Sequence, residues 1–278
     1  MKLTLYQADA FTNKLFHGNP AAIIPLKKWI DDELMQQIAL ENNLSETAFF
    51  IPNSSPMRGG REGAADFDLR WFTPGREIDL CGHATLASAF VIFELLKLKK
   101  KKVVFNTMSG LLEVKKDFQS PPSGVFRGLM DFPSWPPEKV NEYPAELVAS
   151  LGNPEIAGVY RNREFIVELM NEDAVRNCKP DFTLMSKVER MVIITAPGKK
   201  VDFVSRFFAP NSGINEDPVT GSAHSQLIPF WSYKLGKKKM NAKQLSQRGG
   251  DIYCEQKGDR VIMGGQCVFY MKGDIRLT

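Results

Sequence analysis

The sequence has few cysteines, and they are widely spaced. Its 278 residues include four cysteines, no two of which form a Cys-x-x-Cys pair; they stand at positions 81, 178, 254 and 267. Zinc sites and the disulfide frameworks of small secreted proteins usually need closely spaced cysteines, so this spacing suggests neither of them. The sequence is therefore typical of a protein that works in a reducing compartment.

Long apolar segments are absent as well. The longest apolar block, residues 86–93, is far below the roughly 20 residues that a membrane-spanning helix needs. Residues 1–9 alternate between apolar and polar as in a first strand, and they lack the apolar centre of a signal peptide. We therefore expect a cytoplasmic protein that has no membrane partner.

Neither sign of charge predominates. Charged residues make up 24% of the chain and the net charge is only +4, whereas nucleic-acid binders gather basic residues on one face. The basic runs at 97–102 and 237–239 each follow an apolar helical segment, where cations suit a helix C-terminus. We expect no nucleic-acid partner. The hydrophobic content of 43% is that of an ordinary globular protein.

One carboxylate lies directly before an apolar strand. Residues 31–42 have apolar side chains at helical spacing, and residues 47–52 form a short apolar block that ends in proline. Glu46 lies between the two. It is either an ordinary exposed turn residue or a functional acid; a capping box fits poorly, because Ser45 is its direct neighbour and a strand follows.

The rest of the chain divides into two domains. In the first half, residues 67–72 alternate like a strand, and Cys81-Gly82-His83 opens a helix that runs to about Leu96. The segment 119–124, rich in proline, serine and glycine, is the best candidate linker. We expect a first domain of residues 1–118 and a second of 119–278, with the final strand able to return to the first.

The second half repeats the first. Residues 69–74 return as 205–210 and Gly82-His83-Ala84 returns as Gly221-Ser222-Ala223, at offsets of 136 and 139 positions. One repeat of this length indicates a duplicated domain. Two helix N-termini, at Gly82 and Gly221, would then face a shared cleft and attract a carboxylate or an enolate. The alternative is that both glycines merely permit tight turns.

Several motifs together resemble one known family. They are Gly18-Asn19-Pro20-Ala21-Ala22, the run from Asn43 to Phe49 (Asn-Leu-Ser-Glu-Thr-Ala-Phe), Arg70 to Pro74, Cys81 to Thr85, and Glu216 to His224 (Glu-Asp-Pro-Val-Thr-Gly-Ser-Ala-His). The sequence resembles the PhzF-like isomerases of phenazine biosynthesis. This resemblance implies an α+β, diaminopimelate-epimerase-like fold of two pseudo-symmetric domains, each a mixed sheet wrapped around a central helix.

The resemblance also implies a function. It assigns acid/base catalysis to Glu46, supporting roles to His83, Asp217 and Ser222, backbone anion contacts to Gly82 and Gly221, and substrate binding to Asn19. It implies an isomerase that needs neither cofactor nor metal, acts on a small carboxylate in the cleft between the domains, and forms a homodimer. A carboxylate screened from water can take a proton from carbon and return it elsewhere.

Three other functions can be weighed against the isomerase. A catalytically silent binding or interaction module of the same fold remains open, because the presence of site residues does not prove turnover. A two-thiol racemase is disfavoured, since Cys81 is matched by Thr220 in the repeat. A nicotinamide-dependent oxidoreductase is disfavoured too, because Gly264-Gly265 lies outside any Gly-x-Gly-x-x-Gly fingerprint.

Overall fold

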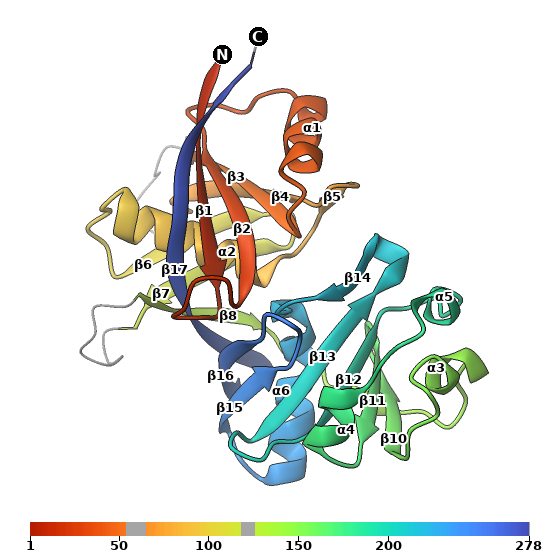
Figure 1. The fold of residues 1–278 in the computed structure, drawn as a ribbon. Coiled ribbons are helices and arrows are strands. Elements are labelled where there is room, and N and C mark those ends of the chain that lie inside the picture. Colours follow the sequence, from red (N-terminus) through yellow and green to blue (C-terminus); the bar gives the residue numbers. More distant parts are fainter. Residues whose placement is uncertain (54–64, 118–125, 278) are drawn as a thin grey trace. The chain divides into compact units, whose positions relative to one another are not determined.

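The computed structural model describes residues 1–53, 65–117 and 126–277 (Figure 1). The chain forms two compact units, the first of residues 1–131 and 264–278 and the second of residues 132–263. Each unit has its own apolar core. No helix in the described ranges is both long and apolar enough to cross a bilayer.

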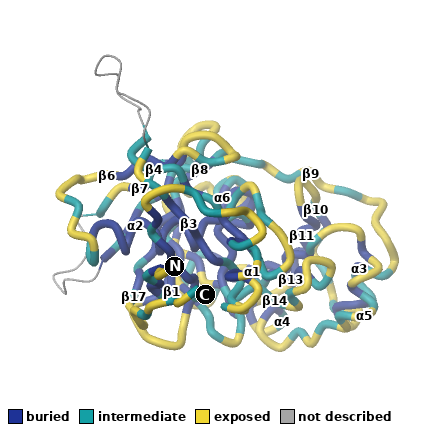
Figure 2. The backbone as a smooth tube through the Cα atoms, turned by 90° about the horizontal axis from the view of Figure 1, so that it is seen from above, coloured by how far each residue is buried: buried dark blue, intermediate teal, exposed yellow. Residues whose placement is uncertain are grey.

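The first unit is built from strands around one buried helix. Its elements are β1 (Lys2–Ala10), β2 (Asn19–Pro25), α1 (Asp32–Asn42), β3 (Glu46–Pro52), β4 (Phe67–Phe72), β5 (Glu77–Ile78), α2 (Gly82–Phe90), a π-helical turn (Val91–Leu95), β6 (Lys102–Thr107) and β7 (Gly110–Lys116). Strands β8 (Arg127–Pro133) and β17 (Arg260–Arg276) belong partly to it. All residues of α2 are buried, and the helix packs against β1, β2, β3 and β7 (Figure 2). An apolar helix buried on every side is the centre of a core.

The second unit has its own central helix. Its elements are β9 (Glu138–Lys139), α3 (Ala145–Ala149), β10 (Ile156–Arg161), β11 (Phe165–Leu169), α4 (Glu172–Asn177), α5 (Phe182–Met185), β12 (Val192–Pro197), β13 (Phe203–Ala209), a 3-10 turn (Pro210–Ser212), β14 (Ile214–Asp217), α6 (Gly221–Leu235), β15 (Lys239–Gln244) and β16 (Gly250–Lys257). Helix α6 begins at the predicted glycine and carries most of its side chains inside.

The strand pairing of the two units follows one pattern. In the first unit β1–β2 is antiparallel, β2–β3 parallel, β3–β4 and β4–β5 antiparallel, β4–β6 parallel and β6–β7 antiparallel. In the second unit β10–β11, β11–β12, β12–β13, β13–β14, β13–β15 and β15–β16 pair in the same series of directions. The duplication read from the sequence therefore extends to the whole topology of each unit.

A partly buried ion pair is duplicated with the strands. Arg70 on β4 binds Glu77 through two hydrogen bonds of 2.6 and 2.7 Å, and Arg206 on β13 binds Glu216 through two of 2.7 and 2.9 Å. Each guanidinium also lies over a phenylalanine two residues further along its strand, at 5.2 and 5.0 Å from the ring centroid. The strand register makes Glu77 and Glu216 equivalent, because each is paired with that phenylalanine.

The units divide inside strands and not at the segment that composition marks as a linker. Residues 119–124 lie outside the described part of the chain. The division falls between Asp131 and Phe132, and again between Met263 and Gly264. The reason is that β8 pairs with β7, so the chain beyond residue 118 remains part of the first unit. The expected return of the final strand occurs, since β17 pairs with β1.

Candidate active site

Local backbone geometry sets the positions of Asn19 and Glu46. Gly18 has a φ of +67°, and a Cβ there would lie 2.1 Å from the carbonyl oxygen of Ala10, so only glycine fits the turn that leads into β2. Asn43, at φ +49°, ends α1 in the left-handed conformation, and the chain then enters β3. Asn19 and Glu46 thus begin two adjacent parallel strands.

The first residues of α2 meet these strand ends. Nε2 of His83 lies 3.0 Å from Oε2 of Glu46, and Nδ1 of the same ring lies 3.2 Å from Nδ2 of Asn19 and 3.5 Å from Sγ of Cys81. The His83 side chain is 4% exposed and that of Glu46 is 13% exposed. Both ring nitrogens are therefore engaged, one by a carboxylate and the other by an amide and a thiol.

The charges of this cluster follow from burial and proximity. Burial lowers the pKa of His83, but its contacts with Cys81 and Glu46 raise it by more, so that the pKa lies well above 6.5. Burial, with a further contribution from Glu46, raises the pKa of Cys81 to about 11, and its thiol is protonated at neutral pH. Glu46 is then the charge that holds His83 as an imidazolium.

The N-terminus of α2 adds donors to the same place. Cys81 is the N-cap residue, and no side chain caps the helix there. The first N–H groups of a helix have no partner within it and carry the positive end of the helix dipole. Gly82, the first helical residue, is buried beside His83. This end of α2 can therefore stabilise negative charge on a bound group.

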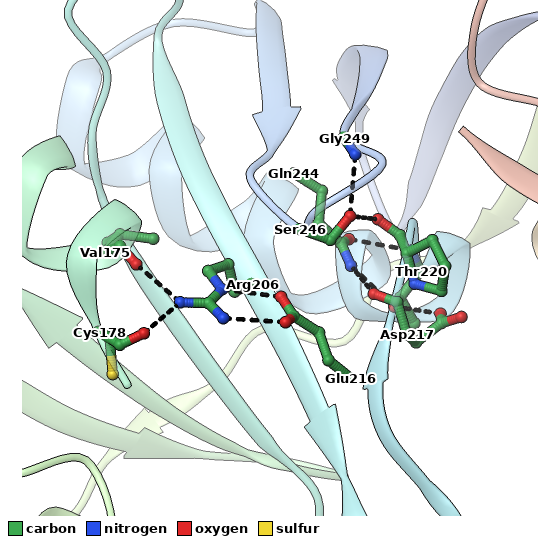
Figure 3. A network of polar contacts seen from close by, with 10 residues as sticks. Val175, Cys178, Arg206, Glu216, Asp217, Thr220, Gln244, Ser246 and Gly249 are labelled. Carbon is green, nitrogen blue, oxygen red and sulfur yellow. Dashed lines mark hydrogen bonds and ion pairs between the residues drawn. The ribbon is translucent and has the colours of Figure 1, made fainter. Parts of the chain in front are cut away.

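The second unit contains the remaining predicted residues, of which Figure 3 shows Asp217. Oδ2 of Asp217 accepts a hydrogen bond of 2.5 Å from Thr220, the N-cap residue of α6. Gln244 accepts from the Thr220 N–H at 2.9 Å and donates to the Asp217 carbonyl at 2.8 Å. Asp217 thus shapes the approach to α6. Gly221 is the first residue of this helix, and no side chain caps the helix there either.

Ser222 follows Gly221 in the first turn of α6. Its side chain is half-buried, and the hydroxyl makes no hydrogen bond to any residue that the structure describes. His224, one turn into the helix, is fully buried and its Nδ1 lies 2.8 Å from the Thr220 carbonyl oxygen. His224 is therefore a packed, hydrogen-bonded residue of the core.

The seven predicted site residues thus fall into two groups. Asn19, Glu46, Gly82 and His83 lie together in the first unit, while the second unit holds Asp217, Gly221 and Ser222. The sequence motifs did not indicate the contact of Cys81 with His83. Gln244 was missed altogether, since no motif links it to residues more than 20 positions earlier.

The carboxylate, thiol and imidazole of the first group can also hold a cation. One ligand atom from each of Glu46, Cys81 and His83 lies within 4.8 Å of the other two. The sequence suggested no metal, because two of these residues are adjacent to a motif glycine while the third stands 35 positions earlier.

Comparisons with known proteins agree on one family. The family model described as phenazine biosynthesis-like protein, PhzC-PhzF, matches residues 8–273. An uncharacterized isomerase of Pseudomonas aeruginosa is 44% identical over 279 residues, which cover 100% of both chains. A PhzF-family phenazine biosynthesis protein from Enterococcus faecalis has a solved structure with a TM-score of 0.88 at 43% identity, covering 100% of both chains.

A more distant structure supports the fold alone. A probable proline racemase from Agrobacterium radiobacter K84, solved with bound carbonate, gives a TM-score of 0.68 at 8% identity and covers 99% of this chain and 93% of its own. The α+β, epimerase-like fold expected from the sequence motifs is therefore confirmed.

Proposed function

This chain belongs to the phenazine biosynthesis-like family and is an isomerase, and we propose that it moves a proton within a small carboxylate-bearing metabolite by general acid/base catalysis. Glu46 is the proton carrier in this proposal, and no cofactor takes part. The observation that carries it is the position of the Glu46 carboxylate, 13% exposed and 3.0 Å from the buried imidazole of His83.

The contacts of Glu46 suit a base that must be ionised before it acts. The Glu46 carboxylate lies at ion-pair distance from the His83 imidazole. The base removes a proton from a carbon whose acidity the substrate carboxylate or carbonyl enhances, and it returns that proton to another carbon of the same molecule. The electrons released from the C–H bond form an enolate-like anion in the meantime.

The end of α2 is suited to that anion. Preorganised N–H groups aimed at developing charge stabilise a transition state more than a ground state. Asn19 would hold the imidazole and contact substrate from the β2 side. The proposal also gives Asp217, Gly221 and Ser222 a part in binding the substrate in a shared cleft; the internal repeat and the family motifs support this part.

The test uses exchange of substrate hydrogen for deuterium. A panel of small unsaturated and hydroxylated carboxylic acids is incubated with the protein in D2O, and deuterium uptake is followed by mass shift and proton NMR. For any acid that exchanges, Glu46→Gln should lower the rate by about 10²-fold or more, the scale of general acid/base catalysis. Glu41→Gln, at an exposed glutamate of α1, is the matched control.

Two results would change the assignment. If Glu46→Gln exchanged at the parent rate while Asp217→Asn did not, Asp217 would be the proton carrier. If the panel bound, as measured by calorimetry, and no member exchanged, the chain would be the silent binding module that the sequence left open.

A further inference from the structure

We propose that Glu46, Cys81 and His83 form a binding site for Zn²⁺, and that this cation competes with the transferred proton for the same atoms. Cation binding itself does not depend on the proposed function. The competition rests on it, because it assumes that Glu46 carries the proton.

The donor set selects the kind of cation. A carboxylate oxygen, an imidazole nitrogen and a thiolate sulfur are the three ligand types that Zn²⁺ takes in proteins. Mg²⁺ and Ca²⁺ prefer sites made of oxygen atoms alone, so they have little affinity for such a set. Three protein ligands leave a fourth tetrahedral position for water or for a carboxylate of the substrate.

The distances are close to those a zinc site needs. Zinc–ligand bonds of the usual lengths place the donor atoms of a tetrahedral site about 3.3 to 3.6 Å apart. Oε2 of Glu46 is 3.0 Å from Nε2 of His83, and Sγ of Cys81 is 3.5 Å from Nδ1 of the same ring. The sulfur and the oxygen face different ring nitrogens, so the Cys81 side chain must change rotamer, or the ring must turn, for one cation to meet all three.

Two buried atoms of the cluster have only each other as partners. Oε2 of Glu46 and Nε2 of His83 lie 3.0 Å apart, and neither has another hydrogen-bond partner among the residues described. A cation that took the place of the proton between them would break no other hydrogen bond of these two atoms. The 13% exposure of the Glu46 side chain supplies a path for a small cation.

Asn19 supplies the outer support that metal-binding histidines usually have. A histidine that binds metal through one nitrogen is held by a hydrogen bond at the other, which fixes the ring orientation. The amide nitrogen of Asn19 lies 3.2 Å from Nδ1 of His83, and an amide N–H can only donate. Binding of a cation through Nε2 therefore requires the Asn19 amide to turn over, so that its oxygen accepts from the N–H at Nδ1.

The first experiment measures metal binding without any substrate. The full chain, stripped with a chelator, is titrated with Zn²⁺ by calorimetry and with Co²⁺ by absorption spectroscopy. We expect one site per chain and the ultraviolet charge-transfer absorption of a Co²⁺–thiolate bond. Since a metal-bound cysteine is deprotonated, the heat in buffers of different ionisation enthalpy should also report proton release.

Matched variants locate the site. Cys81→Ser keeps the size of the side chain, and Thr220 occupies the equivalent position before α6, so the fold tolerates a hydroxyl there. We expect this variant to lose the thiolate absorption and to bind Zn²⁺ at least about 10-fold more weakly. Cys178→Ser, at the half-buried cysteine, should bind like the parent. Circular dichroism verifies folding of both.

The same experiment can overturn the proposal. Equal Zn²⁺ affinity of the parent and of Cys81→Ser, or a Co²⁺ spectrum without a thiolate band, would exclude the site. If the proposal holds, Zn²⁺ should abolish deuterium exchange in the parent, and a chelator should restore it. A parent that binds Zn²⁺ but exchanges no acid would retain this site and lose only the proposed function.

Discussion

Two buried histidines show how surroundings decide the charge of the same side chain. His83 lies against the Glu46 carboxylate, and its pKa is raised well above 6.5 although burial opposes this. His224 is also buried, but its Nδ1 lies against the backbone carbonyl of Thr220 and not against a carboxylate. Burial then dominates, and it lowers the pKa of His224 to about 4. The His83 imidazole is suited to pair with a proton carrier, whereas the His224 imidazole packs inside the core.

The first prediction at this scale concerns acid stability. Because the pKa of His224 falls from 6.5 in the unfolded chain to about 4 in the folded one, the unfolded state binds the proton more tightly. The stabilisation is present above pH 6.5 and is lost as the pH falls towards 4. Between pH 7.5 and 5 this residue alone should cost about 2 kcal/mol of unfolding free energy.

The comparison with His224→Gln isolates that contribution from all other titrating groups. The free energies of unfolding of both proteins are measured in urea at pH 7.5 and pH 5, and the variant should lose less stability. Imidazole NMR offers a direct check, since the chain has only three histidines. A His224 ring that titrates near 6.5 in the folded protein would contradict the prediction.

At the scale of elements, the two equivalent arginines differ in the partners that they bind besides their glutamates. Arg70 completes its contacts with Asp32, whose side chain is 71% exposed. Arg206 donates instead to the carbonyls of Val175 and Cys178 at the end of α4, and its own side chain is only 11% exposed (Figure 3). Arg206 thereby joins β13, β14 and α4, while Arg70 joins strands to the solvent-facing start of α1.

The second prediction follows from this difference in burial. Removal of one partner from a buried ion pair costs about 3 to 5 kcal/mol, because the other charge is left without compensation. Arg206→Ala should therefore destabilise the second unit by about 3 kcal/mol, and Arg70→Ala should destabilise the first by less. Urea unfolding is followed by tryptophan fluorescence, using Trp231 for the second unit and Trp71 for the first.

A surface pair supplies the control for both arginines. Lys199→Ala breaks a pair with Asp173 in which both side chains are more than half exposed, so it should cost at most about 1 kcal/mol. Equal losses for the two arginine variants would show that burial does not set the value of these ion pairs.

How far the elements were predictable depended on their length and on their periodicity. The strands β3, β4, β12 and β13 and the starts of α2 and α6 were all indicated by short apolar blocks and by the repeat. The helices α4 and α5, with 6 and 4 residues, carry too few turns for a periodic signal. The division inside β8 had no local signal either, because strand pairing depends on residues distant in the chain.

The same distinction holds for the candidate site. Glu46 and His83 were indicated as site residues by the family motifs, and the structure places their side chains 3.0 Å apart. The contact of Asn19 with the His83 ring, and of Cys81 with the same ring, depends on where β2 and α2 meet. That meeting is set by packing of the core and not by residue spacing.

At the scale of the whole molecule, one strand closes the first unit from the far end of the chain. Strand β1 pairs with the C-terminal part of β17 along its whole length, from Lys2 opposite Arg276 to Ala10 opposite Cys267. The N-terminal amine also donates to the Leu277 carbonyl at 2.6 Å, and the two chain ends lie side by side (Figure 1). The first unit is thus discontinuous in sequence, while the second is one continuous segment.

The last prediction concerns folding of the separated units. A fragment of residues 132–263 contains all of its own unit and should unfold cooperatively in urea. A fragment of residues 1–131 keeps β2 beside β1 but lacks β17, so the other edge of β1 is unpaired and the fragment should be unfolded or aggregate. A permuted form of the first unit places residues 264–278 before residues 1–131, with a short glycine-serine linker between residue 278 and Met1. It should recover cooperative unfolding, because the two chain ends that the linker joins already lie side by side. Circular dichroism and Trp71 fluorescence measure each transition. Cooperative unfolding of residues 1–131 alone, at the stability of the permuted chain, would show that β17 is dispensable to the unit that contains Glu46 and His83.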